Sequence, residues 1–186
     1  MKGIIIAAGA GVGKSYLGKK YKNILDFDTV QIPLQWSSKG LEHLSIEERK
    51  GLYRELNPNY PQNVIDELIK QRKNYDIILI GPPYQTHKFF EDKEKQVADY
   101  LFKHNIEFYI AMPSEKGVEI ILQRMKERGN PEQFINQFAA CYPAHIKEFL
   151  KDKYKKIPIL DGEYLEDTLI RHGFIGKNSC GRGSWT

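Results

Sequence analysis

The first fifteen residues constrain the fold more than any other stretch of this chain. An apolar run over residues 4–8 precedes a turn over residues 9–13 with glycine at every second position, and Lys14 and Ser15 follow directly. The run has the character of a buried central strand, and the residues after the turn have a helical pattern. Glycines let the backbone curl so that successive N–H groups face an anion, and the N-terminus of a helix adds positive potential. The stretch therefore predicts a strand, a phosphate-binding turn and a helix.

This stretch resembles the phosphate-binding loop of the P-loop NTPases, G-x-x-x-x-G-K-[ST], and matches seven of its eight positions. The first glycine of the pattern falls on Ala8. Alanine lacks the freedom of glycine at positive φ, so position 8 is where a strained or shifted loop is expected. The resemblance implies that Lys14 reaches the β- and γ-phosphates of a nucleoside triphosphate and that the Ser15 hydroxyl ligates Mg²⁺. The alternative is a glycine-rich turn that packs tightly and binds nothing. The residues implied in nucleotide binding are Gly9, Ala10, Gly11, Val12, Gly13, Lys14, Ser15 and Tyr16.

Length and composition indicate one globular domain. The chain has 186 residues, a formal net charge of +4 and two cysteines, Cys141 and Cys180. This length suffices for a substantial core, and the mild positive charge suits an anionic substrate without requiring nucleic acid. The sequence has no apolar run of membrane-spanning length and no cysteine or histidine motif for metal, so we expect a cytoplasmic protein with reduced thiols and no membrane contact. Residues 1–175 are expected to form the domain and residues 176–186 a mobile tail.

Strand and helix patterns alternate along the chain. The continuous apolar run near residue 78 is typical of a strand buried on both faces, and Ser45 with Glu48 matches a capping box at the start of a helix. The order predicts an α/β three-layer sandwich with a five-stranded, mostly parallel sheet, a helical lid and a ligand crevice at the carboxyl ends of the strands. Expected strands cover 4–8, 24–29, 75–80, 107–111 and 157–160, and expected helices cover 14–23, 45–56, 62–73, 92–105, 114–128, 134–150 with a bend near Pro143, and 163–172.

Two acids end the second expected strand. Asp26 and Asp28 are one residue apart, so both side chains can point one way while Phe27 points the other. In the small P-loop kinases that the loop resembles, an acid at this place orients or deprotonates the phosphate acceptor, and Asp28 is our candidate for that role. Asp26 is our candidate for holding Mg²⁺ or its bound water together with Ser15, and capping of a backbone N–H is the alternative role. The simpler alternative is a pair of solvated acids.

The third expected strand ends without an acid. The position after residue 80 is Gly81, where the resemblance would place a second magnesium-associated carboxylate. This absence argues against a motor ATPase or a switch GTPase, whereas small-molecule kinases vary more here. The segment 81–87 is expected to shape a substrate pocket, in which Tyr84 and His87 stack on a base or form hydrogen bonds with it. The alternative is a surface turn without a binding role. Other aromatic side chains that would stack on a base, unless they belong to the core, are Trp36, Tyr53 and Tyr60.

Arg124 and Arg128 are four residues apart on one expected helix and therefore share a face. The resemblance implies a closing lid over residues of about 115–140, whose arginines neutralise charge on the transferring phosphoryl group. The planar guanidinium suits this task because it binds two phosphate oxygens at once. Gly129 and Asn130 follow as a plausible hinge. The alternative is a solvated helix face.

Together these features are similar to those of the small nucleoside and nucleotide kinases of bacteria and their phages. The expected activity is ATP- and Mg²⁺-dependent phosphoryl transfer to a small acceptor, a nucleoside or a (deoxy)nucleoside monophosphate, with Lys14, Asp28, Arg124 and Arg128 as catalytic residues. One alternative is a kinase of polynucleotide ends or of modified bases in DNA, for which the lysines of the segment 147–156 would form a basic surface. The other alternative is an ATP-binding protein without catalysis.

Overall fold

The computed structural model describes residues 3–28, 34–37, 40, 43–44, 48, 55–84 and 93–176. Its strands are β1 (Ile4–Ala8), β2 (Ile24–Asp26), β3 (Trp36–Ser37), β4 (Glu55–Leu56), β5 (Ile77–Ile80), β6 (Phe108–Pro113) and β7 (Lys155–Ile159). Five of them form one sheet in the order β2-β5-β1-β6-β7, in which every neighbouring pair is parallel. The short strands β3 and β4 pair with each other in antiparallel fashion.

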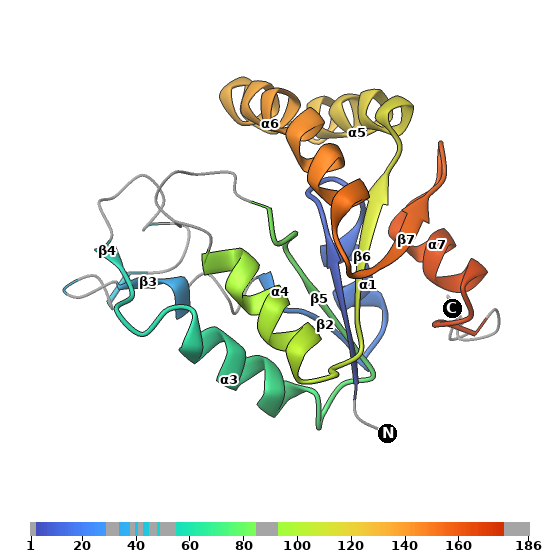
Figure 1. Cartoon of the computed structure of the whole chain (residues 1–186). Coiled ribbons are helices and arrows are strands. Elements are labelled where there is room, and N and C mark those ends of the chain that lie inside the picture. Colours follow the sequence, from blue (N-terminus) through green and yellow to red (C-terminus); the bar gives the residue numbers. More distant parts are fainter. Residues whose placement is uncertain are drawn as a thin grey trace, which may run out of the picture.

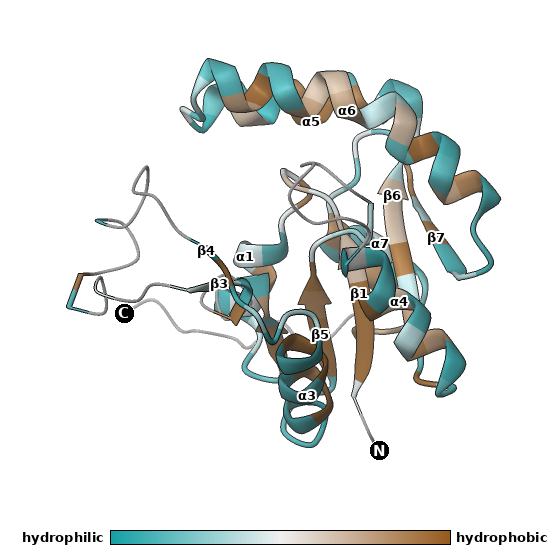
Figure 2. Ribbon diagram, turned by 60° about the vertical axis from the view of Figure 1, so that its left-hand side comes forward, coloured by the Kyte–Doolittle hydropathy of each residue, from teal (hydrophilic) through white to brown (hydrophobic). Residues whose placement is uncertain are grey.

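The centre of the sheet is apolar on both faces. All four residues of β5 are buried, and the β1 residues from Ile5 to Ala8 are fully buried. A parallel strand that is covered on both faces has to be apolar throughout, which is why these two segments read as continuous runs rather than as alternating patterns. Figure 2 shows the resulting hydrophobic centre of the sheet, with the more polar surfaces of the helices around it.

Helices cover both faces of the sheet (Figure 1). They are α1 (Lys14–Lys20), α3 (Gln62–Gln71), α4 (Lys93–Lys103), α5 (Glu115–Glu127), α6 (Glu132–Lys151) and α7 (Leu165–Arg171). Residues of α3 and α4, such as Leu68 and Leu101, pack with Ile5 in one core cluster. Residues of α1 and α7, such as Leu17 and Leu169, belong to the cluster on the opposite face. The predicted α/β architecture, a five-stranded parallel sheet between helices, is therefore confirmed.

The segment predicted as a lid forms α5 and the first part of α6. Both helices lie at the end of the molecule where β1 and β6 end (Figure 1). Ser114, the first residue of the helix predicted over 114–128, caps α5 by accepting a hydrogen bond from Gly117 N at 3.0 Å. The long segment that follows is a single helix with Pro143 inside it. Its second half buries Ile146 and Phe149 in the core, so α6 joins the segment predicted as a lid to the body of the domain.

The helix predicted over residues 45–56 is wrong at its C-terminal end. Glu55 and Leu56 form β4 and pair with β3, and Asn57 N donates a hydrogen bond to Gln35 O at 2.8 Å. Pro58 disfavours a helical conformation of Asn57, so an extended approach to this proline is the better local solution. Apart from Glu48, which lies in a turn, residues 45–54 fall outside the described residues, as does the predicted tail beyond residue 176.

Other predicted boundaries shift by a few residues, and Ala8 shows no strain. β2 ends at Asp26 and α1 at Lys20, each three residues earlier than predicted. Ala8 is the last residue of β1 and pairs with Ala111 of β6. Positive φ angles in the loop fall on Gly11 and Gly13, at 78° and 105°, and among the described non-glycine residues only Asn105 has one. The loop therefore turns at its later glycines, and a strand conformation at position 8 accommodates alanine.

We expect Gly11→Ala to lower the free energy of unfolding more than Gly129→Ala does. The two φ angles are nearly equal, 78° and 76°, so each alanine carries the same left-handed backbone cost, roughly 1–2 kcal/mol. A Cβ on Gly11 would also lie 2.6 Å from Ile121 Cγ2, whereas nothing lies within 4 Å of a Cβ on Gly129. Because Ile121 is buried, this overlap adds about 1–3 kcal/mol. Urea unfolding of both variants measures the difference, and equal costs would show that α5 does not press on the loop.

Candidate functional site

The turn between β1 and α1 presents the N-terminal end of a helix. Gly13 is the N-cap of α1, and its carbonyl accepts the first helical hydrogen bond from Leu17 N at 3.1 Å. The N–H groups at the start of a helix have no partner within the helix, so they are donors for a ligand in the turn. The positive φ angles of Gly11 and Gly13 produce this turn.

The Lys14 ammonium group lies inside this turn and meets three oxygen atoms. Nζ donates to Ala8 O at 2.7 Å and to Gly9 O at 2.8 Å, and it lies 3.2 Å from Asp28 Oδ2. Only 9% of the side chain is exposed. An ammonium group this buried needs such partners, because removing it from water is costly. The end of β1 and the segment after β2 therefore meet at one cation.

The Asp28 carboxylate lies at a cavity wall rather than in the core, since 36% of its side chain is exposed. Burial raises the pKa of this carboxyl above its ordinary value; the neighbouring Lys14 lowers the pKa in part, and Asp26 raises it further. Asp28 also lies near Gly81: a Cβ added to Gly81 would lie 3.5 Å from Asp28 Oδ1. A carboxylate of raised pKa that keeps contact with solvent is suited to accepting a proton.

A polar cavity of about 790 Å³ lies beside the loop. The loop, α5 and the turn between β7 and α7 all contribute to it. It brings Arg124 and Arg128, which were predicted to share a face, into one wall with the predicted phosphate loop. Its described lining residues are Gly9, Ala10, Gly11, Gly13, Lys14, Ser15, Tyr16, Asp28, Arg124, Glu127, Arg128, Tyr164, Glu166 and Asp167.

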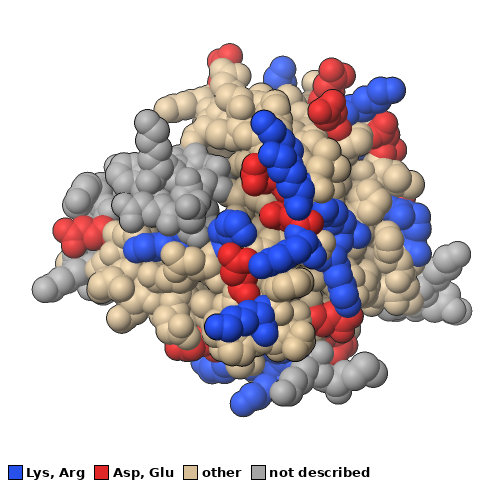
Figure 3. Space-filling view, in the orientation of Figure 1, with Lys and Arg blue, Asp and Glu red and all other residues tan. Residues whose placement is uncertain are grey.

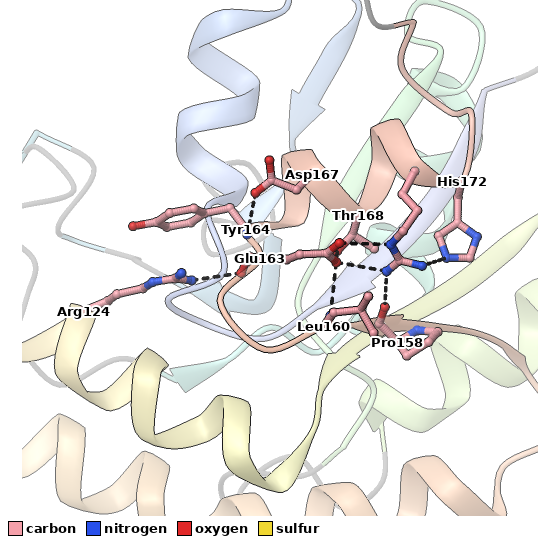
Figure 4. Close-up of polar contacts among 9 residues, drawn as sticks. Arg124, Pro158, Leu160, Glu163, Tyr164, Asp167, Thr168 and His172 are labelled. Atoms are coloured by element: carbon pink, nitrogen blue, oxygen red, sulfur yellow. Dashed lines mark hydrogen bonds and ion pairs between the residues drawn. The ribbon is translucent and has the colours of Figure 1, made fainter.

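Arg124 is held by the turn between β7 and α7 (Figure 4). Its Nη1 donates to Glu163 O at 3.1 Å, its Nη2 donates to Gly162 O at 2.9 Å, and its guanidinium lies 3.6 Å from the centroid of the Tyr164 ring. The same turn is joined to the loop, because Leu165 N donates to Val12 O at 2.9 Å. The arginine, the turn and the loop thus form one connected wall of the polar cavity.

A second cavity, of about 220 Å³, is mainly apolar. One face of α6 and the end of β6 form much of its wall. Tyr142 fixes these two elements together by donating a hydrogen bond to Pro113 O at 2.9 Å, and its ring centroid lies 5.3 Å from that of Phe138. The described lining residues are Gly9, Ala10, Val12, Lys14, Asp28, Gly81, Pro82, Ala111, Met112, Pro113, Ile121, Phe134, Gln137, Phe138, Cys141, Tyr142 and His145.

The two cavities meet at Lys14 and Asp28. Of the described residues, Gly9, Ala10, Lys14 and Asp28 line both cavities. Ser15 lines the polar cavity, whereas Asp26 is not among the described lining residues of either one. Asp26 is instead buried under α1, where a Cβ on Gly18 would lie 2.9 Å from Asp26 Cβ. Since β2 ends at Asp26, the strand alternation that suggested a common direction for the two acids does not extend to Asp28.

The aromatic residues that were predicted to stack on a base contribute to other parts of the molecule. Tyr60 and Tyr84 are buried in the core, and Trp36 packs against the same core cluster. The Tyr84 ring lies 5.8 Å from His145, in a small separate cavity that both residues line. Tyr53 and His87 fall outside the described residues.

Basic and acidic side chains are mixed on the surface around α4, α6 and β7. Asp99 pairs with two lysines: its Oδ2 lies 3.3 Å from Lys95 Nζ, and its Oδ1 lies 3.2 Å from Lys153 Nζ. Lys156 Nζ donates to Leu150 O at 2.9 Å, and so lies beside the C-terminal turn of α6. Figure 3 shows acidic side chains among the basic ones on the face that it presents. The described lysines of the segment 147–156 therefore do not make a surface of one sign.

Sequence reasoning missed the turn before α7 and the cavity-lining face of α6. Gly162 and Tyr164 follow the last strand of the sheet, and the rule that ligands bind at the carboxyl ends of strands applies to them as well. On α6, the apolar spacing was used only to predict a helix over residues 134–150. The residues that line the apolar cavity, Phe134, Gln137, Phe138, Cys141, Tyr142 and His145, recur at helical spacing and form one face.

Within the described residues, no three His, Cys, Asp or Glu side chains gather as a metal-binding group. Nor does any helix there have the length and apolar character needed to cross a membrane. No protein-family model matches this sequence, and a search of curated proteins finds no match.

We expect Glu163→Gln to destabilise the protein at neutral pH and to lose this effect in acid. Arg171 Nε and Nη2, Thr168 Oγ1 and Leu160 N all donate to the Glu163 carboxylate, whose side chain is 20% exposed (Figure 4). These bonds, above all those from Arg171, lower its pKa from 4.5 to about 2. A carboxyl of depressed pKa stabilises the fold above its unfolded pKa, and the contribution disappears as the pH falls through the folded value.

The free energy of unfolding of the variant should therefore be about 1–3 kcal/mol lower than that of the wild type at pH 7, and this difference should shrink between pH 4.5 and pH 2. Chemical denaturation at several pH values measures it. Glu119→Gln, at an exposed position of α5, is the matched control and should show no such pH-dependent difference. A constant difference down to pH 2 would contradict the assigned role of the carboxylate.

Proposed function

We propose that this protein is a P-loop kinase that transfers the γ-phosphoryl group of ATP to a hydroxyl group of a small acceptor. The observation that carries the proposal is the junction of the two cavities. Lys14 and Asp28 line both of them, so a group transferred from a ligand in one cavity to a ligand in the other would pass this ion pair. Phosphoryl transfer needs positioning and neutralisation of charge more than covalent chemistry, and a cation beside a carboxylate supplies both.

The polar cavity is the proposed site of ATP. Its lining includes the glycine turn, the start of α1 and three basic side chains, Lys14, Arg124 and Arg128. The N–H groups at the start of α1 would donate to phosphate oxygens. Lys14 would exchange its contacts with Ala8 O and Gly9 O for the β- and γ-phosphates. The two arginines would neutralise the charge of the phosphoryl group during transfer, since each guanidinium binds two oxygens.

The residues present fit Mg²⁺ as a cofactor, because Mg²⁺ binds through few protein oxygens, with phosphates and water as its other ligands. Ser15, which lines the polar cavity, is the proposed ligand. Asp26 lines neither of the two cavities, and its carboxylate accepts a bond of 3.4 Å from Asp28 N, which is the alternative role of capping a backbone N–H; its part in holding Mg²⁺ stays a prediction. When bound, the ion neutralises charge on the triphosphate.

Asp28 is the proposed group that positions the acceptor. The acceptor hydroxyl would donate a hydrogen bond to its carboxylate. As the hydroxyl oxygen forms a bond to the γ-phosphorus, the bond from that phosphorus to the β,γ-bridging oxygen breaks, ADP leaves, and the hydroxyl proton passes to Asp28. The raised pKa of Asp28 favours this proton transfer, because a more basic carboxylate holds the proton better.

We expect Lys14→Ala to lower ATP-dependent phosphoryl transfer by at least about 100-fold while the protein remains folded. The loss follows from removing the cation that neutralises the phosphates. Transfer of labelled phosphate from ATP to nucleosides, monophosphates and oligonucleotides gives the rate, and a thermal unfolding scan verifies the fold. Lys19→Ala, at an exposed position of the same helix, is the matched control and should keep full activity. Unchanged turnover in Lys14→Ala would refute the assignment of the site.

We expect Asp28→Asn to lower kcat by about 100-fold and to remove the acid limb of the pH profile. Asp28 must be ionised to accept the proton, so activity should fall as the pH drops through its pKa. Since burial raises this pKa, the limb should lie above the ordinary value of 3.8. Measuring kcat/KM against pH for both proteins checks this. If the acid limb persists unchanged in Asp28→Asn, the limb reports the titration of another group and the role assigned to Asp28 is wrong.

A further inference from the structure

The apolar cavity has a built aromatic wall at the point where the proposed acceptor has to lie. Phe134, Phe138 and Tyr142 line it from α6, and Met112 and Pro113 line it from the end of β6. The bond of 2.9 Å from Tyr142 to Pro113 O and the contact between the Phe138 and Tyr142 rings fix this wall. Apolar walls with a few convergent polar groups are typical of sites for small organic ligands.

The volume of the cavity limits the size of its occupant. About 220 Å³ is available. A cavity of roughly 150 Å³ holds benzene, and sites for drug-sized molecules span roughly 300–1,000 Å³. The cavity therefore suits a single ring system with its substituents. It cannot enclose a whole dinucleotide or a second nucleoside triphosphate.

The charge of the cavity limits its occupant further. Of the described lining residues, only Lys14 and Asp28 carry formal charges, leaving aside the imidazole of His145, and these two pair with each other at 3.2 Å. The arginines Arg124 and Arg128 line the polar cavity instead. A monophosphate in the apolar cavity would bring a charge of about −2 next to Asp28, and Lys14 is the only lysine or arginine among the described lining residues. Burying such a charge without its own cation is costly.

We propose that the phosphate acceptor is an uncharged alcohol with one ring system, rather than a nucleoside monophosphate or an aliphatic polyol. This proposal rests on the kinase function proposed above. The ring would lie against Phe138 and Tyr142, and the hydroxyl group would point to Asp28 at the junction of the cavities. A free nucleoside has this chemistry, and so does a single base that bears a hydroxyl group within a DNA strand.

An acceptor panel tests the proposal. It contains nucleosides, their 5′-monophosphates, ribitol as a polyol without a ring, and single-stranded oligonucleotides with and without one hydroxyl-bearing base. We expect the uncharged ring-bearing alcohols to have a kcat/KM at least about 100-fold above those of the monophosphates and ribitol. A preference for the hydroxyl-bearing oligonucleotide over the free nucleoside would support the proposal and identify DNA as the source of the ring. A preference for monophosphates or ribitol would overturn it and leave the kinase function standing.

A cavity-filling variant provides a readout that does not depend on activity. Cys141→Trp should weaken calorimetric binding of the preferred acceptor at least about tenfold, while the affinity for ATP changes less than twofold. Ala140→Trp, at the adjacent exposed position of α6, is the matched control and should leave both affinities unchanged. Equal acceptor affinity in wild type and Cys141→Trp would overturn the assignment of the cavity. Absence of ATP binding in the wild type would instead refute the kinase function itself.

Discussion

The organisation of this site depends on the contacts of one ammonium group. Lys14 Nζ meets Ala8 O, Gly9 O and Asp28 Oδ2, so the end of β1, the glycine turn and the segment after β2 converge on a single buried charge. A charge in this position is tolerated only when its donors are matched by oxygen atoms. Because the three acceptors lie at or just after the carboxyl ends of β1 and β2, which are parallel and separated by β5 alone, the fold itself provides the pairing. The apolar centre of β1 and β5 holds these ends in register.

Much of the fold could be predicted because its signals are local. The runs of β1 and β5 are continuous and apolar, which only a strand covered on both faces requires. Ser114 marks the start of α5 through its own side-chain bond to Gly117 N. The spacing of Arg124 and Arg128 placed both on one helix face, and both line the polar cavity. Each of these features depends on residues within one element, so the sequence alone carries the information.

The features that could not be predicted depend on contacts between distant segments. Glu55 and Leu56 are in a strand because they pair with Trp36 and Ser37, a partner that no local pattern identifies. The role of Tyr164 depends on Arg124, which reaches it from another element. β2 ends at Asp26, so the alternation of side chains along a strand does not determine the direction of Asp28. The two acids therefore have different surroundings despite their spacing.

The same limit applies to the cavity-lining face of α6. Apolar residues at helical spacing are consistent with both a core and a cavity wall, and α6 contributes to both along its length. Residues on one face between Phe134 and His145 line the apolar cavity, whereas Ile146 and Phe149 pack in the core. Only the arrangement of β6 and the glycine turn around the helix decides which residues face a cavity.

The shared lining of the two cavities has a thermodynamic consequence. An anion bound in the polar cavity would compete with Ala8 O, Gly9 O and Asp28 Oδ2 for the Lys14 ammonium group. A weaker ion pair would make the Asp28 carboxylate a stronger acceptor for a hydroxyl donor in the apolar cavity. Linkage would require the converse by the same factor: a donor bound to Asp28 would make Lys14 more available to the anion. Occupancy of the two cavities would therefore be positively coupled through this one ion pair.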